Sequence, residues 1–332
     1  MTPLMELTQV SHSYGPVRAL SELTVRIEAG AIGLVGQNGA GKSTLMQILL
    51  GLIRPTSGTA HVLGLDVRKS GVELRRRVGF MPERNALIPG LNGVEYVALA
   101  GELCGMPRRQ ALRRAHETLS HLGMEDARYR RIDQYSLGMT QRIKLAATLV
   151  HDPDLLLLDE PTSGLDPEGR SAMLALLGTL AARPGKSLLL ASHLLGDIER
   201  VCSSAIILHQ GKVVSVGRLS DLKAARQRCY RLRWEGNGES YVEALGRRGV
   251  TFPSAARNGE VRAVVPDNWL TRSFFAIASE CGALVTGLVA EEEDLEAVYH
   301  RLVGGELARD ANASAGKSSA PEAVSHAPGA TR

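Results

Sequence analysis

One glycine-rich octapeptide carries the clearest chemical signal in this sequence of 332 residues. It reads Gly-Gln-Asn-Gly-Ala-Gly-Lys-Ser and follows the apolar run Ala31–Val35, which has the character of a buried strand. Glycines let successive backbone N–H groups converge on phosphate oxygens, and a helix that begins at Lys42 points its positive dipole end at the same anion. The pattern predicts a site for a nucleoside triphosphate, formed by Gly36, Asn38, Gly39, Ala40, Gly41, Lys42 and Ser43.

Two consecutive carboxylates supply a second chemical signal. Asp159 and Glu160 directly follow the run Leu155–Leu158, at the end of a predicted buried strand. In an open α/β sheet, this is where residues are presented to a bound ligand. A triphosphate site also needs a divalent cation and an activated water nearby. We therefore predict that Asp159 helps to bind magnesium and that Glu160 activates water.

Short apolar runs alternate with helical patterns as far as about Val216, and this rhythm predicts a mostly parallel, doubly wound sheet. A helical, arginine-rich segment between Leu91 and His121 interrupts the rhythm and indicates an inserted helical subdomain. The runs expected to form the strands of the sheet are Ala31–Val35, Val78–Met81, Leu155–Leu158, Leu188–Ala191 and Ala205–Leu208.

The pattern changes after Asp221 to that of a small α+β domain. The acidic run Glu291–Asp294 is interpreted as the first turn of a final helix rather than as a metal site. From about Gly304 no periodicity could bury an apolar face, which predicts a disordered tail at 304–332. The expected elements are strands near Tyr230–Trp234, Val261–Val265 and Leu284–Leu288, and helices near Tyr241–Arg248, Leu270–Cys281 and Glu292–Leu302.

Further motifs give the sequence a specific family resemblance. The segment Tyr135–Met139 resembles the signature motif of ATP-binding cassette (ABC) ATPases, and Pro161–Pro167 resembles their D-loop. His193 follows a predicted strand as the family's switch histidine does, and Tyr14 lies where the family places the aromatic residue that stacks on adenine. The resemblance covers roughly residues 3–220.

This resemblance implies roles for individual residues, with ATP and Mg²⁺ as cofactors. Lys42 would neutralise β- and γ-phosphate oxygens, and Thr44 would contact the α-phosphate. Ser43 would ligate the magnesium ion with Asp159. Glu160 would act as the general base, His193 would orient the γ-phosphate, and Tyr14 would stack on adenine. Two such domains close head to tail in the family, so Ser136, Gly138 and Asp166 would belong to a composite nucleotide site shared with a second ABC subunit.

The chain departs from the common family pattern at three positions. Glu83 stands where the family usually has glutamine, and we expect its carboxylate to contribute to the metal site. Leu137 and Met139 replace a glycine and a glutamine of the signature motif. These variants resemble bacterial exporter ATPases of the ABC-2 type, from antibiotic and lantibiotic resistance systems. The domain after Asp221 resembles the C-terminal extension of the same group.

Composition limits the other functions. The net charge of +4 is modest and only 4% of residues are aromatic, so no nucleic-acid partner is expected. The four cysteines have no C-x-x-C spacing, which indicates neither a zinc cluster nor a disulfide framework. The apolar runs are far shorter than the ~20 residues that span a bilayer. A reducing cytoplasm fits, and the resemblance implies attachment to the inner face of the membrane through separate permease subunits.

The resulting interpretation is an α/β phosphate-loop NTPase cassette with a mostly parallel core sheet, an N-terminal antiparallel β part and an inserted helical subdomain. We expect the ATPase domain at 3–220, its helical subdomain at about 90–150, and the accessory α+β domain at 225–303. The predicted function is ATP hydrolysis that energises a permease, most readily an exporter, by a homodimer in preference to a heterodimer. Two alternatives stay open: a soluble cassette ATPase that acts on a macromolecular complex, and a nucleotide-binding regulatory module.

Overall fold

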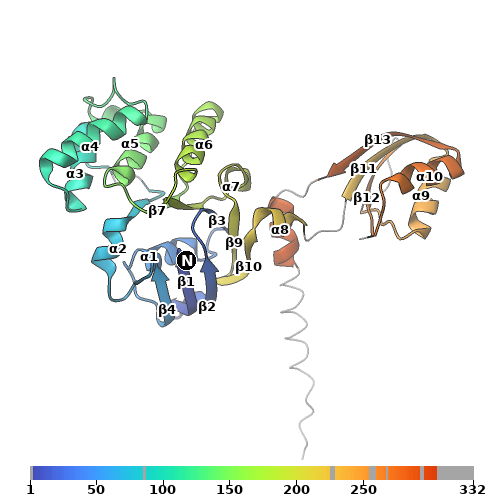
Figure 1. The fold of residues 1–332 in the computed structure, drawn as a ribbon, viewed down its shortest axis with the longest axis horizontal. Helices are drawn as coiled ribbons and strands as arrows, with labels where there is room; N and C mark the ends of the chain where they lie inside the picture. Colours follow the sequence, from blue (N-terminus) through green and yellow to red (C-terminus); the bar gives the residue numbers. More distant parts are fainter. Residues whose placement is uncertain are drawn as a thin grey trace, which may run out of the picture. The chain divides into compact units, whose positions relative to one another are not determined.

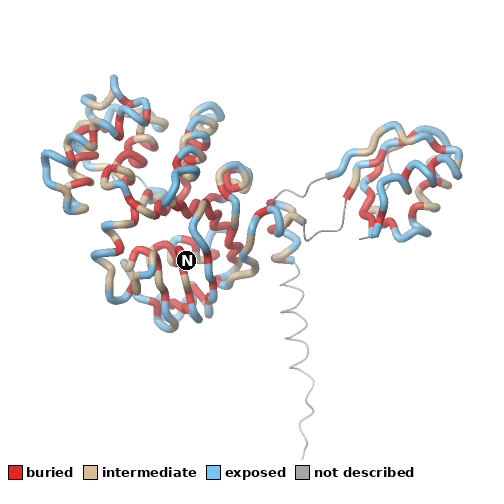
Figure 2. The backbone as a smooth tube through the Cα atoms, in the orientation of Figure 1, coloured by how far each residue is buried: buried red, intermediate tan, exposed pale blue. Residues whose placement is uncertain are grey.

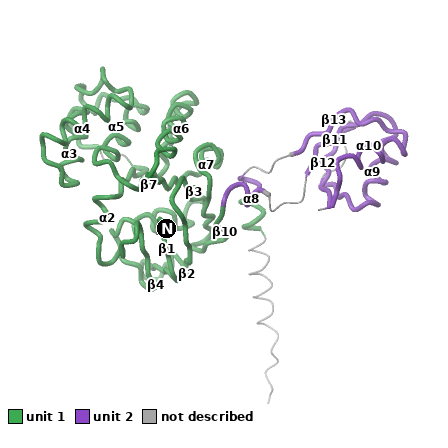
Figure 3. The backbone as a smooth tube through the Cα atoms, viewed as in Figure 1, with its two compact units in different colours: residues 1–217, 299–332 green, residues 218–298 purple. Residues whose placement is uncertain are grey.

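The computed structural model describes residues 3–84, 87–224, 229–253, 259–266, 268–291 and 295–304. The chain divides into two compact units, which Figure 3 distinguishes by colour. The first unit comprises Met1–Gly217 together with Tyr299–Arg332, and the second comprises Arg218–Val298. The chain therefore leaves the first unit at residue 217 and returns to it at residue 299.

A six-stranded sheet forms the centre of the first unit, in the order β10-β9-β3-β8-β7-β6. The pairs β3/β8, β3/β9, β6/β7 and β7/β8 are parallel, as the sequence predicts. All residues of β3, β7 and β8 are buried, which explains why these strands are continuously apolar rather than alternating. The strands are β3 (Ala31–Val35), β6 (Val78–Met81), β7 (Leu155–Asp159), β8 (Ser187–Ala191), β9 (Ser204–His209) and β10 (Lys212–Arg218).

An antiparallel sheet from the N-terminal part of the chain packs beside this centre, in the order β2-β1-β4-β5. Its strands are β1 (Met5–Tyr14), β2 (Val17–Ile27), β4 (Ser57–Val62) and β5 (Leu65–Asp66). One buried apolar cluster joins Leu20 of β2, Leu45 of helix α1 (Lys42–Leu49) and Leu157 of β7. Helix α1 is thus anchored to both sheets, as the buried segments in Figure 2 illustrate. This anchoring holds the loop before α1 in place.

Helices α3 (Gly93–Leu103), α4 (Arg108–His121) and α5 (Leu137–Leu149) form the expected helical subdomain (Figure 1). Asn92 and Glu95 form a reciprocal capping box at the start of α3. A short 3₁₀ helix, η1 (Ile132–Gln134), precedes α5. The remaining helices of this unit include α2 (Gly71–Arg77), α6 (Pro167–Ala181) and α7 (Leu195–Val201).

The second unit begins with α8 (Leu219–Ala224) and contains the antiparallel sheet β12-β11-β13 with helices α9 and α10. Its core is aromatic: Tyr241 and Phe274 are fully buried, and the Tyr241 hydroxyl donates a hydrogen bond to the Phe274 carbonyl over 2.9 Å. Trp234 and Trp269 belong to the same cluster. The elements are β11 (Cys229–Gly236), α9 (Gly238–Arg247), β12 (Glu260–Val264), α10 (Arg272–Cys281) and β13 (Ala283–Glu291).

The end of the described chain corrects one prediction. Glu291 is the last residue of β13, so it does not open the final helix. Its backbone pairs with Cys229 of β11, which extends the strand further than the apolar run suggests. Residues 292–294 of the acidic run lie outside the described residues, and residues 295–304 are helical. The predicted tail from residue 305 onward also lies outside them.

Candidate nucleotide site

The loop between β3 and α1 forms one wall of the site, and its glycines are required by geometry. A side chain at Gly36 would place its Cβ 2.8 Å from the Leu208 carbonyl oxygen. Gly41 has a φ of +102°, and a Cβ there would lie 2.6 Å from Leu20 Cδ2 and 2.8 Å from the Ala19 carbonyl oxygen. Only glycine satisfies both the left-handed backbone and the close approach of β2. The loop is therefore shaped by its neighbours as well as by its own sequence.

Lys42 is the first residue of α1, directly after this loop, and is buried. Its Nζ donates hydrogen bonds to the carbonyl oxygens of Gly36 over 2.6 Å and Gln37 over 3.1 Å. Burial lowers the pKa of this ammonium group, while the carboxylates of Glu160, Asp159 and Glu83 act in the opposite direction. A cation held by loop carbonyls and facing acidic groups can bridge phosphate oxygens to that acidic wall.

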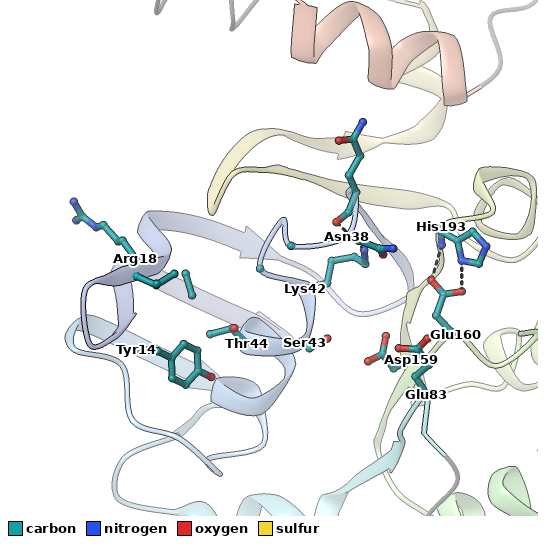
Figure 4. A pocket seen from close by; sticks show the side chains of 15 residues that line it. Tyr14, Arg18, Asn38, Lys42, Ser43, Thr44, Glu83, Asp159, Glu160 and His193 are labelled. Atoms are coloured by element: carbon teal, nitrogen blue, oxygen red, sulfur yellow. Dashed lines mark hydrogen bonds and ion pairs between the residues drawn. The ribbon is translucent and has the colours of Figure 1, made fainter.

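Asp159, the last residue of β7, is buried beside Glu83, and Figure 4 shows the two carboxylates close together. Burial, Glu83 and Glu160 raise the pKa of Asp159 to about 6, against the opposing effect of Lys42 and Lys144. Two neighbouring carboxylates repel one another, and a hard divalent cation relieves that repulsion. The Ser43 hydroxyl lines the same cavity and adds a further oxygen donor. These oxygen donors fit Mg²⁺.

Glu160 is held in a strained backbone conformation at the end of β7. Its φ is +49°, which costs a residue other than glycine on the order of 1–3 kcal/mol. Its N–H donates to the Ala191 carbonyl over 2.9 Å, and its carboxylate accepts a hydrogen bond from the His193 N–H over 2.7 Å. His193 Nδ1 lies 2.9 Å from Glu160 Oε2. These contacts over-determine the position of Glu160 and aim its carboxylate at the cavity.

The cavity has a volume of about 830 Å³, which is the size of a small-molecule site. Figure 4 shows the labelled side chains around it, with Tyr14 at the end opposite Glu160 and His193. Tyr14 is 48% exposed, and its hydroxyl donates to Gln47 Oε1 over 3.2 Å, so an open aromatic face remains available. Of the predicted residues, the structure brings together Tyr14, Asn38, Gly39, Gly41, Lys42, Ser43, Thr44, Glu83, Asp159, Glu160 and His193.

The other predicted residues lie outside the lining of this cavity. Gly36 and Ala40 are buried inside the loop that they shape. Ser136 caps helix α5, where its Oγ accepts the Met139 N–H over 3.3 Å, and Gly138 lies in the first turn of that helix. Asp166 caps α6 by accepting the Gly169 N–H over 3.2 Å. Each of these two caps marks the N-terminus of a helix, which carries the positive end of the helix dipole.

Some residues of the site are not signalled by any motif. Val17, Arg18 and Ala19 line the cavity beside Tyr14, because β2 pairs with β1 and returns past the phosphate loop. The position of a hairpin partner three to five residues after Tyr14 is the one sequence signal that could have found them.

A second feature without a sequence signal is a buried hydrogen-bond network beside the segments that carry Glu160 and His193. Asp197 of α7 is 1% exposed. Its carboxylate accepts a hydrogen bond from Thr162 Oγ1 over 2.6 Å and from Arg170 Nε over 2.7 Å. Thr162 comes two residues after Glu160, and Asp197 comes four residues after His193. The network therefore ties together the two segments that carry the Glu160–His193 pair.

Among the described residues, no helix is long and apolar enough to cross a membrane. A sequence profile described as "ABC transporter" matches residues 20–163. The ABC transporter ATP-binding protein YxlF of Bacillus subtilis is 32% identical over 305 residues, covering 90% of this chain and 99% of that protein. The daunorubicin/doxorubicin resistance ATP-binding protein DrrA of Streptomyces peucetius is 35% identical over 225 residues, covering 68% of each.

A solved structure gives the same answer for the fold. The dimeric post-hydrolysis state of an ATP-binding cassette bound to ADP and phosphate has a TM-score of 0.59 and 26% identity, and the match covers 65% of this chain and 98% of that one. The α/β core of this chain agrees in fold with that cassette. This chain belongs to the ATP-binding subunits of the ABC transporter family.

Proposed function

We propose that this protein hydrolyses ATP and thereby energises a separate membrane permease that exports its substrate. One observation carries the ATPase assignment: a buried lysine, a carboxylate pair and a glutamate–histidine pair surround one cavity at the carboxyl edge of a parallel sheet. The direction of transport is supported by the likeness to a drug-resistance ATP-binding protein. Drug resistance is consistent with removal of the compound from the cell.

Different residues of the cavity have different roles in phosphoryl transfer. Lys42 and the loop N–H groups hold the β- and γ-phosphates, and the N-terminus of α1 adds its dipole. Ser43, Asp159 and Glu83 would hold Mg²⁺, which would supply charge neutralisation at the phosphates. Glu160 accepts the proton of the attacking water. His193 positions the Glu160 carboxylate and reaches the γ-phosphate, so catalysis rests on orientation and electrostatics.

We infer that a second copy of the chain completes the site. Ser136, Gly138 and Asp166 lie at helix N-termini outside the cavity of their own chain. A helix N-terminus favours an anion, so the signature end of a partner subunit can close over the γ-phosphate. A dimeric cassette among the solved relatives supports this arrangement. Glu160→Gln protein should shift from monomer to dimer when ATP is added, as measured by light scattering, and a persistent monomer would contradict the inference.

A groove on the first unit is suited to the permease. It has a volume of about 510 Å³ and lies among α2, α3, α5 and β6. Its edges carry three strongly exposed apolar residues, Leu52, Val72 and Leu103, with Leu103 at 79% exposure. Apolar side chains this exposed are typical of an interaction surface. An amphipathic cytoplasmic helix of a permease fits such a groove.

The ATPase assignment is tested by Glu160→Gln. This change keeps the hydrogen-bonding shape of residue 160 but removes its basicity, so phosphate release should fall by about 10²- to 10⁴-fold. The affinity for a fluorescent ATP analogue should stay within a few fold of the original. Glu28→Gln serves as the control, because Glu28 is an exposed glutamate outside the cavity. Undiminished turnover in Glu160→Gln would overturn the assignment of the base.

The permease assignment is tested by Leu103→Asp. A charge in the groove should remove the chain from the membrane fraction of the cells that produce it, while ATP hydrolysis by the purified chain persists. Leu284→Asp is the matched control, since Leu284 is 64% exposed in the second unit. If both variants stay with the membrane to the same degree, the groove is not the docking site.

A further inference from the structure

One buried lysine has no part in the mechanism proposed above. Lys144 lies on α5, eight residues after the Ser136 cap, and is only 4% exposed. Its Nζ donates a hydrogen bond to the backbone carbonyl of Glu83 over 3.0 Å. It therefore reaches the residue at which this chain has a carboxylate in place of the family's usual glutamine.

A buried ammonium group is costly unless it is paired. Burial lowers the pKa of Lys144, and the carboxylates of Glu83 and Asp159 oppose that shift, which places both carboxylates within electrostatic range. The relation is reciprocal, because Lys144 and Lys42 are the two cations that favour ionised Asp159. Lys144 thus supplies a buried positive charge that partly compensates the negative charges of Glu83 and Asp159.

The same helix also contacts the segment that follows Glu160. Gln141 Nε2, three residues before Lys144, donates to the Ser163 carbonyl over 3.2 Å. Ser163 lies three residues after Glu160 in the D-loop segment. Helix α5 therefore holds the Glu83 segment through Lys144 and the segment after Glu160 through Gln141.

We propose that Lys144 is a positioning residue that holds the Glu83 segment against α5 and offsets the added carboxylate, so that it limits how tightly the site binds a divalent cation. The proposal rests on the proposed function in one respect, namely that Glu83 and Asp159 face the metal of a bound nucleotide. With Glu83 and Lys144 both present, the charge near the metal resembles that of a site with neutral side chains at both positions. Either change alone should unbalance the site, in opposite directions.

The test measures the affinity for a fluorescent non-hydrolysable ATP analogue at pH 8 under two conditions, once with Mn²⁺ present and once with a chelator present. The ratio of the two affinities reports the contribution of the metal. Lys144→Met removes a nearby positive charge and should raise the ratio by at least about threefold. Glu83→Gln should lower it by a similar factor. The double variant should return to within about twofold of the original protein.

Two further variants separate charge from structure. Lys144→Gln keeps a donor for the Glu83 carbonyl without the charge and should also raise the ratio, whereas Lys69→Met, at an exposed lysine outside the cavity, should not change it. A ratio that is unchanged or lowered in both folded Lys144 variants, or a double variant whose ratio stays at the value of either single variant, would overturn the proposal. If the original protein fails to bind the analogue at all, the proposed function itself fails instead.

Discussion

Replacing Asp197 with alanine should destabilise the first unit without affecting the second. The change removes the acceptor for Thr162 and Arg170, whose donors lie 2.6 Å and 2.7 Å from the Asp197 carboxylate. Both donors then lose a charged partner inside a buried region. Because these contacts connect the segments after Glu160 and His193, their loss should also make the positions of Glu160 and His193 less fixed.

The magnitude follows from the burial of the three groups. Breaking a buried charge pair by removing one partner costs about 3–5 kcal/mol. The Arg170 side chain is 35% exposed and regains some hydration, so the lower end applies and we expect about 3 kcal/mol. For a unit of this size, each kcal/mol lowers the midpoint by roughly 2–4 °C, which gives a shift of about 6–12 °C.

The positions of the two tryptophans make the assay selective. Trp234 and Trp269 are the only tryptophans of the sequence, and both belong to the core of the second unit. Tryptophan fluorescence therefore reports unfolding of the second unit, while far-UV circular dichroism reports mainly the larger first unit. In Asp197→Ala protein, the circular dichroism midpoint should fall and the fluorescence midpoint should stay unchanged.

A matched control exists on the surface of the same unit. Asp133 pairs with Arg131 over 2.9 Å, but both side chains are about half exposed, so Asp133→Ala should give no measurable shift. Asp197→Asn keeps an acceptor for Thr162 and should lie between Asp197→Ala and the original protein. A circular dichroism shift below about 2 °C in Asp197→Ala, or an equal shift by fluorescence, would refute the reasoning.

Three other predictions concern the cavity. Lys42→Ala should weaken ATP binding by about ten- to hundredfold through loss of charged hydrogen bonds, measured by fluorescence titration; unchanged affinity would contradict the phosphate-loop assignment. Gly41→Ala forces a Cβ to within 2.6 Å of Leu20 and should abolish nucleotide binding, whereas Gly178→Ala, in open space on α6, should stabilise by about 0.5–1 kcal/mol. The raised pKa of Asp159, about 6, means that this proposed metal ligand becomes protonated and loses its negative charge as the pH falls through that value. Mn²⁺-dependent nucleotide binding should therefore be about tenfold weaker at pH 5 than at pH 7. An affinity that does not change between these two pH values would exclude Asp159 as the metal ligand.

The strands and the phosphate loop could be predicted because their causes are local. Leu155–Leu158 is a continuous apolar run because every residue of β7 is buried, and the glycines of the loop are fixed in spacing by the turn that they make. The order of the motifs along the chain then indicated which side chains meet at the carboxyl edge of the sheet. The cavity brings together most of the residues expected to meet there.

The contacts behind the cavity could not be predicted because they join residues far apart in the sequence. Thr162 and Asp197 are separated by 35 positions, and Glu83 and Lys144 by 61. Such pairs depend on how strands and helices are ordered in space, and no local pattern encodes them. The left-handed backbone of Glu160 is likewise imposed by the contacts of its N–H and carboxylate rather than by its residue type.

The return of the chain to the first unit at residue 299 affects how the protein can be divided. Tyr299 and Val303 are buried, at 4% and 8% exposure. Burial raises the pKa of the Tyr299 hydroxyl, and the nearby backbone N–H of Gln37 opposes that shift. In topological terms the second unit is therefore an insertion, tethered at both ends, rather than a terminal appendage. A protein that stops at residue 217 loses a piece of the cassette that borders the phosphate loop, whereas joining Gly217 to Tyr299 through a flexible linker removes the insertion alone.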